Sequence, residues 1–382
     1  MKSMNGTLTK TETSEKRDKT MGILTGIAIV LVVLGHLDMN ELSVFGLFPY
    51  YSFHVMIFLF VSGYFYDPVH EEKIMSYIGH KALKLLLPYY VFNLIYGVIS
   101  QILFMNGFSY CGELNLRNLF LEPFLGGHQF GLNFPSWFVP ALFIIEVLNI
   151  LGRKVISLLF AKVADERKKC LMTDMIIFVP VLAVGIATVY LAQGGHVWGL
   201  YKTPGRILFM LPVYEMGIIY RRYIKDAEVK IPNALCIGLI CLIQFVLYVY
   251  AGGRLNFSAV WCTSFASIPV MPYLTVITGT WFWLRISRII EDTAFGDMFD
   301  DIGTASFDIM MHHIAVFFLV NLVAYRICMT FAVDNAFDSA AFHSDVVYTY
   351  LPLGMYAWKY LYLIPGILLP MAASKLRRRQ VR

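Results

Sequence analysis

Two histidines in neighbouring apolar segments are the residues of this chain best suited to chemistry. His36 ends the segment GILTGIAIVLVVLGH, and His54 lies near the start of FHVMIFLFVSGYFY. An ionisable side chain is costly in membrane hydrocarbon, so each histidine is a candidate for a functional site. A neutral imidazole, with a pKa of about 6.5, suits a general base near pH 7. The alternative is a pair of hydrogen-bonded histidines that only tie helices together.

The segments around these histidines belong to a chain with the composition of a polytopic membrane protein. Apolar residues make up 58% of it and charged residues 15%, whereas soluble domains contain about 25% charged residues. Long apolar runs without strict alternation favour membrane helices over a barrel. The fold class predicted is an all-α polytopic membrane protein with about ten transmembrane helices. These are expected at residues 21–38, 46–66, 83–106, 134–152, 174–193, 204–221, 233–251, 266–286, 305–330 and 347–372.

Lysine and arginine gather in every second loop between these segments. By the positive-inside rule these loops are cytoplasmic, and so are the N- and C-termini. We therefore expect a cytoplasmic tail at residues 1–20, a transmembrane domain at 21–372 and a basic cytoplasmic tail at 373–382. The net charge of +5 is interpreted as orientation charge, with the lipid bilayer as partner and no nucleic acid.

The predicted depths of the polar residues suggest which of them meet. At a rise of about 1.5 Å per residue, His36 and His54 both lie in the outer third of the membrane and are expected to face one cavity. Glu146, Glu215 and His313 lie near the midplane, and Arg206 lies near the outer face. Arg206 and Glu215 point to opposite sides of their helix, so each is expected to need a partner on another helix, either an ion pair or a cavity.

Other chemistry finds little support in the sequence. Phosphate-binding glycine loops and the G-x-S-x-G motif are absent, which argues against an ATPase or a serine hydrolase. The six cysteines form no C-x-x-C pair, and no metal site is predicted. The long outer loop 107–133 is expected to be a lid or binding element, with a short interfacial helix at NLFLEPFLG. The acidic segment EDTAFGDMFDD is expected to be a solvated connector.

Several segments, taken in order, resemble the acyltransferase-3 family of integral-membrane O-acyltransferases, and its sugar O-acetylase-like subgroup most. GIAIVLVVLGH ends in the family's histidine at His36, and FHVMIFLFVSGY resembles the family's FHMPLFFFLSGY. PSWFVPALF resembles a signature at Trp137, and IGTASFDIMMHH resembles a motif that places Ser306 seven residues before His313. One departure is Thr25, which stands where the family usually has a basic residue on the face of His36.

The resemblance implies transfer of an acyl group, most simply acetyl, from cytoplasmic acetyl-CoA to a hydroxyl of a cell-surface or lipid-linked glycan, without a metal. His36 is expected to be the general base and His54 a second base or an orienting group. Arg206 or His313 is expected to stabilise the oxyanion or the donor. The other expected substrate-binding residues are Trp137, Ser62, Tyr64 and Glu215. The expected location is the bacterial plasma membrane. A transporter or flippase of a glycan or lipid-linked intermediate, and a scaffold or sensor without turnover, remain as alternatives, and the oligomeric state is open.

Overall fold

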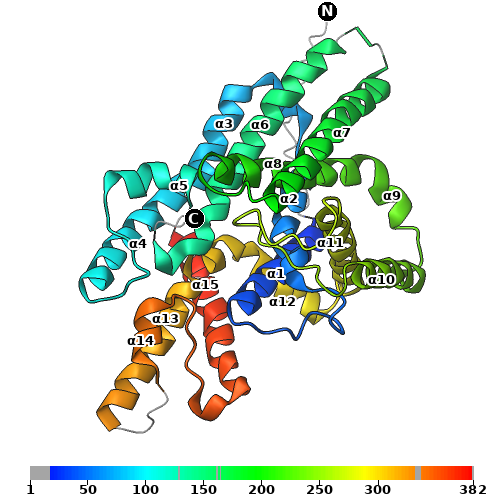
Figure 1. Cartoon of the computed structure of the whole chain (residues 1–382). Coiled ribbons are helices and arrows are strands. Elements are labelled where there is room, and N and C mark those ends of the chain that lie inside the picture. Colours follow the sequence, from blue (N-terminus) through cyan, green and yellow to red (C-terminus); the bar gives the residue numbers. More distant parts are fainter. Residues whose placement is uncertain (1–17, 128–129, 161, 164, 332–336, 381–382) are drawn as a thin grey trace, which may run out of the picture.

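The computed structural model describes residues 18–127, 130–160, 162–163, 165–331 and 337–380, and within these residues the regular structure is helical (Figure 1). The only other pairing among them is an isolated antiparallel bridge between Ser258 and Thr263. The helices are α1 (Lys19–His36), α2 (His54–Tyr64), α3 (Ile74–Lys81), α4 (Leu87–Met105), α5 (Glu122–Leu125), α6 (Phe138–Leu159), α7 (Glu166–Gln193), α8 (Lys202–Ile219), α9 (Lys225–Glu228), α10 (Asn233–Tyr250), α11 (Met271–Ile289), α12 (Ala294–Thr304), α13 (Ser306–Phe331), α14 (Ser339–Ser344) and α15 (Tyr360–Gln380).

Each of the ten predicted spans overlaps one of these helices, but the helices differ in length and polarity. Six helical segments of the described chain are long and apolar enough to cross a membrane. They are Lys19–His36, Ile74–Met105, Gly131–Leu159, Arg167–Gln193, Asn233–Tyr250 and Ser306–Phe331. The four other predicted spans overlap α2, α8, α11 and α15. With 11 residues, α2 extends only about 16 Å, which is too short for a hydrocarbon core of about 30 Å. The count of ten and the orientation of the termini stay predictions.

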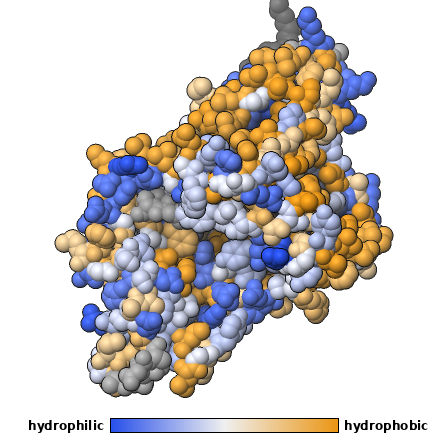
Figure 2. Space-filling view, in the orientation of Figure 1, coloured by the Kyte–Doolittle hydropathy of each residue, from blue (hydrophilic) through white to orange (hydrophobic). Residues whose placement is uncertain are grey.

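Helix α1 lies in the interior, and other helices form the apolar outer surface. Nearly all side chains of α1 are buried, as expected for a helix that is apolar on every side. By contrast, α7 and α10 leave many leucine, isoleucine and valine side chains exposed. Figure 2 shows these apolar residues gathered over α7 and α10. Following the predicted topology, we call the side at which α1 begins the inner side and the side at which it ends the outer side.

Two helix crossings depend on glycine. A Cβ atom on Gly63 of α2 would lie 1.9 Å from the backbone oxygen of Tyr214 in α8, and one on Gly217 would lie 2.0 Å from that of Phe60. At the second crossing, a Cβ on Gly26 of α1 would meet the backbone oxygen of Phe299 in α12 at 1.9 Å. Because glycine has no Cβ atom, the backbones of these apolar helices can approach closely and pack through dispersion forces.

The acidic segment is not a simple connector, because most of it forms α12, which packs along α1, while the carboxylates of Asp297 and Asp301 stay exposed as expected. Ile302 and Gly303 are buried, and a Cβ on Gly303 would lie 2.1 Å from the backbone oxygen of Gly22. Phe299, Ile302 and Gly303 follow helical spacing and share the packed face of α12, whereas Phe295 and Met298 are exposed. The expected short helix of the outer loop is present as a π-turn and α5 over residues 117–125.

The glycine crossing of α2 and α8 can be tested by adding one methyl group. We expect Gly63→Ala to destabilise the purified protein by about 1–3 kcal/mol, because the helices must move apart. Gly238→Ala in α10 is the matched control, since a Cβ there meets no atom within 4 Å. Thermal unfolding in detergent measures both variants. Equal melting temperatures for Gly63→Ala and the wild type would contradict the close crossing.

Candidate active site

A cavity of about 320 Å³ lies between α1, α2, the start of α6 and the start of α13. Its lining comes from one face of α1, from residues between 51 and 62, from residues between 134 and 142, from residues 257–260 and from the first turns of α13, with Leu85. Most of these side chains are aliphatic or aromatic. A small number of polar groups in an apolar concavity is typical of a binding or active site.

The cavity is elongated along α1. Thr25, Ile29, Val32 and His36 all line it, and their spacing places them on one face of the helix. From Thr25 to His36 this face extends about 16 Å. The sequence spacing therefore predicted correctly that Thr25 and His36 face the same space. Thr25 and Ser62 lie toward the inner end of the cavity, and His36 and His54 lie toward its outer end.

His54 begins α2 and presents a defined nitrogen to this cavity. Its Nδ1 lies 2.5 Å from the backbone oxygen of Tyr50. A carbonyl oxygen only accepts, so Nδ1 carries the proton and Nε2 of the neutral ring is the basic nitrogen. The edges of the rings of Tyr50 and Tyr51 pack against the imidazole at 5.9 and 5.1 Å between centroids. The ring is thus held in one orientation and one tautomer.

His36 ends α1 and packs between two rings. Its imidazole is stacked on that of His313 at 5.3 Å between centroids and meets the ring of Phe134 at 5.0 Å. His313 is fully buried, and its Nδ1 lies 2.7 Å from the backbone oxygen of Ile309. The Nε2 of His313 has no hydrogen-bond partner among the residues that the structure describes. The structure therefore brings the first-helix histidine against His313 of α13, 277 residues later in the chain by the numbering of the two residues.

Of the residues predicted to bind substrate, Trp137 and Ser62 line the cavity and Arg206 lies directly behind it. The guanidinium carbon of Arg206 is 4.7 Å from the centre of a Trp137 ring. Its Nε donates to the backbone oxygen of Val260 at 2.8 Å, and an Nη donates to that of Gly126 at 3.2 Å. Val260 also lines the cavity, so Arg206 supports the outer wall from behind.

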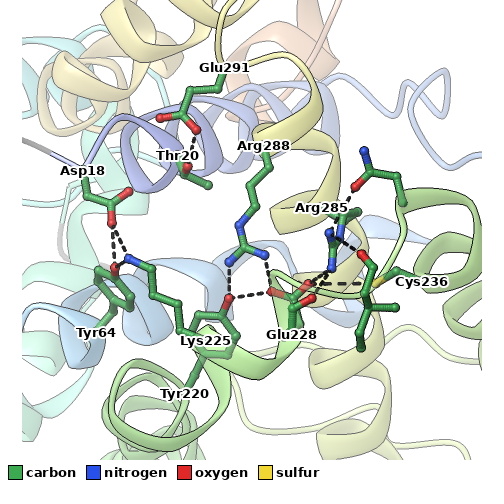
Figure 3. A network of polar contacts seen from close by, with 12 residues as sticks. Asp18, Thr20, Tyr64, Tyr220, Lys225, Glu228, Cys236, Arg285, Arg288 and Glu291 are labelled. Carbon is green, nitrogen blue, oxygen red and sulfur yellow. Dashed lines mark hydrogen bonds and ion pairs between the residues drawn. The ribbon is translucent and has the colours of Figure 1, made fainter.

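Tyr64 lies outside the cavity in a polar network on the inner side (Figure 3). Its hydroxyl donates to Asp18 at 2.6 Å and accepts from Lys225, which also pairs with Asp18 at 3.2 Å. Burial alone would raise the pKa of the Asp18 carboxyl, but hydrogen bonds from Tyr64 and the backbone of Met21 outweigh it, so that pKa lies below its usual value. These contacts tie the start of α1 to the end of α2 and to α9.

Glu215 also lies outside the cavity, in a buried ion-pair cluster. Its carboxylate accepts from Arg153 of α6 and from the Asn149 amide. Arg153 also pairs with Asp174 of α7 at 2.5 Å, and Arg222 reaches the same carboxylate at 2.8 Å. Arg153, Asp174 and Glu215 are almost completely buried. Glu215 therefore joins α8 to α6 and α7 and does not line the cavity. Its contact with substrate stays a prediction.

Glu146 also forms an ion pair with a cation of another helix, because its carboxylate accepts from Lys81 of α3 at 2.6 Å. Arg153 directly follows the predicted span 134–152 and so falls among the loop lysines and arginines that were interpreted as orientation charge, but the structure places it in the interior. The signal was available: Glu146, Asn149 and Arg153 lie at positions i, i+3 and i+7 of one helix and so share a face. Polar residues repeated on one face of an apolar helix indicate partners on the neighbouring helices.

Together these features define a membrane protein whose described residues form helices around an apolar cavity. The model of the acyltransferase-3 family, described as an acyltransferase domain, matches residues 21–333. The match covers most of the chain, and the protein therefore belongs to this family of membrane acyltransferases. No curated protein and no solved structure matches the chain. Among the described residues, no group of three or more histidine, cysteine, aspartate or glutamate side chains could hold a metal ion.

The ion-pair cluster predicts a structural effect of Glu215. Glu215→Gln leaves the buried Arg153 guanidinium with one carboxylate fewer, and breaking a buried pair costs about 3–5 kcal/mol. We expect a clear fall in the melting temperature, while acyl-donor affinity of the protein that remains folded stays unchanged. Glu113→Gln, on the outer loop, is the control for loss of one carboxylate. A Glu215→Gln protein of normal stability but weakened substrate binding would instead favour a direct contact with substrate.

Proposed function

We propose that this protein transfers an acyl group, most simply acetyl, from cytoplasmic acetyl-CoA to a hydroxyl of a cell-surface or lipid-linked glycan. The observation that carries the proposal is the elongated cavity with His36 and His54 at its outer end. Acyl transfer needs a base near the hydroxyl and a dry space for the thioester. The sugar O-acetylase-like subgroup, the plasma membrane of a bacterium and the domain limits at residues 21 and 372 are parts of the same proposal.

In the proposed reaction a histidine takes the proton from the acceptor hydroxyl as its oxygen attacks the thioester carbonyl carbon. The carbon–sulfur bond then breaks, and the proton held by the histidine neutralises the leaving thiolate, which departs as coenzyme A. His36 is the proposed general base, and His54 is a second base whose Nε2 is made basic by the bond from Nδ1 to Tyr50. His313 is the proposed positioning residue that fixes the plane of His36 through the stacked contact.

The inner end of the cavity is the proposed entrance for the donor. Thr25 and Ser62 line this end, and Arg221 lies nearby, where it donates to the backbone oxygen of Tyr64 at 3.1 Å. Arg221 is exposed and has no carboxylate partner among the described residues, whereas Lys225 is paired with Asp18. We assign to Arg221 a contact with the phosphates of coenzyme A. Thr25, which stands where the family usually has a basic residue, carries no charge and cannot fill this role.

The two histidines give the first test of this function. We expect His36→Ala to lower acyl transfer by at least 100-fold, because general acid–base catalysis contributes about 10²–10⁴ in rate. His54→Ala should also lower the rate, but less if it only orients substrate. The measurement is an O-acetyl signal in the proton NMR spectrum of the polysaccharide, together with consumption of acetyl-CoA by purified protein.

His312→Asn is the matched control for this test. His312 is also a histidine of α13, but it hydrogen-bonds Tyr96 at 2.7 Å and does not line the cavity. Normal transfer by correctly folded His36→Ala protein would refute the role of His36. Absence of acetyl-CoA consumption by the wild type with every acceptor would favour a transporter or a scaffold.

The donor route gives a second test. Ile29 lines the cavity between Thr25 and His36, so Ile29→Trp should fill the channel and lower the rate at least tenfold without removing a catalytic group. Val246→Trp on α10 is the control, because Val246 is exposed on the apolar outer surface. Steady-state rates with acetyl-CoA are compared after the folded fraction of each variant has been determined. Equal rates for the two variants would show that the donor does not pass Ile29.

A further inference from the structure

A cluster of cationic and aromatic side chains covers the outer end of the cavity beside the start of α8. It consists of Lys202, Arg206, Trp137, Trp198 and Trp261, and we call it the outer cationic cluster. Lys202 and Arg206 are four residues apart and therefore lie on the same face of α8. Trp137 lines the cavity, and Trp261 follows Val260, which lines it as well. The cluster is thus continuous with the space that contains the two histidines.

Arg206 is a buried cation with no counter-charge in the part of the chain that the structure describes. Its residue surface is 2% exposed, and no carboxylate among the described residues lies within ion-pair distance of it. The guanidinium has five N–H groups, and the described residues accept from two of its nitrogens, at Val260 and Gly126. A buried charge is normally paired because desolvation is expensive. The remaining N–H groups are therefore suited to an anion that comes from outside the protein.

Lys202 adds a second positive charge over aromatic rings. Its Nζ lies 4.3 Å from the centre of a Trp261 ring and 5.9 Å from one of Trp198. These two tryptophans are 5.5 Å apart between ring centroids. The carboxylate that acts on Lys202 is that of Glu122, which already pairs with Arg117 at 3.1 Å. The cluster as a whole keeps an excess of positive charge.

This combination of groups fits one class of ligand. A planar guanidinium binds carboxylate or phosphate oxygens in pairs. Tryptophan faces offer a flat apolar surface with little flexibility, which suits the C–H face of a sugar ring. A neutral sugar would contact only the tryptophan rings, and the charge of the Arg206 guanidinium would still lack an anion. An acidic sugar, or a sugar joined to a phosphate, uses both features.

The geometry points to an acceptor that carries an oxyanion next to the sugar that is acylated, with Arg206 and Lys202 as its binding residues. This inference rests on the proposed function for the identity of the acceptor as a glycan, but binding itself needs no acyl transfer. The oxyanion has two sources with the same chemistry, the carboxylate of a uronic acid and the diphosphate that joins a glycan to its lipid carrier.

Isothermal titration of the full-length protein in nanodiscs, without acetyl-CoA, tests the inference with three probes. They are trigalacturonic acid, the same trisaccharide after reduction of its carboxyl groups, and the reduced trisaccharide joined to a polyprenyl diphosphate. We expect an anionic probe to bind at least tenfold more tightly than the neutral trisaccharide, because charged hydrogen bonds are the stronger ones. The difference should shrink as salt is added.

Arg206→Gln should remove about tenfold or more of the affinity for the anionic probe, and Arg206→Lys should restore part of it because the charge returns without the planar fork. Lys202→Gln is a second variant in a more accessible position, in case Arg206→Gln does not fold. Arg254→Gln, an exposed arginine in the loop after α10, is the matched control and should bind as the wild type does.

The outcomes distinguish the two sources of the oxyanion, and they test the anion site separately from the proposed acyl transfer. Tight binding of trigalacturonic acid assigns the oxyanion to an acidic sugar, and tight binding of the diphosphate probe alone assigns it to the lipid carrier. Equal affinity for the neutral and anionic probes, binding of none of them, or affinity unchanged in both Arg206→Gln and Lys202→Gln overturns the inference. Probe binding without any acetyl-CoA consumption would leave the anion site standing and remove only the acyltransfer proposal.

Discussion

The arrangement of the site depends on one buried cation, Arg153. Its ion pairs with Glu215 and Asp174 join α6, α8 and α7, and α8 in turn holds α2 through the glycine crossing at Gly63. The position of His54 at the start of α2 follows from these contacts. Because water is excluded from the cluster, the charges cannot separate without a large loss of solvation. A membrane protein thereby uses electrostatics where the hydrophobic effect offers no force between helices.

The cations of the inner side and of the outer side differ in their partners. On the inner side Glu228 pairs with Arg285 and Arg288, and Asp18 pairs with Lys225 (Figure 3), so that each of these three cations has a carboxylate partner within the protein. On the outer side Arg206 is buried, and no carboxylate of the described residues pairs with it. The ion pairs of the inner side maintain the helix arrangement, whereas Arg206 of the outer side is the residue that we propose binds an anion.

Sequence reasoning predicted those features that depend on one helix at a time. The helical class, the apolar segments and the shared face of Thr25 and His36 follow from hydropathy and from helical periodicity. The contact of His36 with His313 and the pairing of Glu215 with Arg153 depend on how distant helices pack, and a single sequence does not contain that information. Helix α12 was missed for another reason: its acidic residues suggested a connector, and its buried residues are only Gly296, Ile302 and Gly303.

The apolar lining of the cavity has a consequence for the membrane as a barrier. A passage that extends about 16 Å along α1 would conduct ions if it were filled with water. Side chains such as Ile29, Val32, Phe58 and Leu142 line it instead, and a narrow apolar passage loses its water readily. On the donor route that we propose, this apolar lining admits a long, slender molecule from one side and opposes the passage of ions, so that the same side chains serve as substrate channel and as electrical insulation.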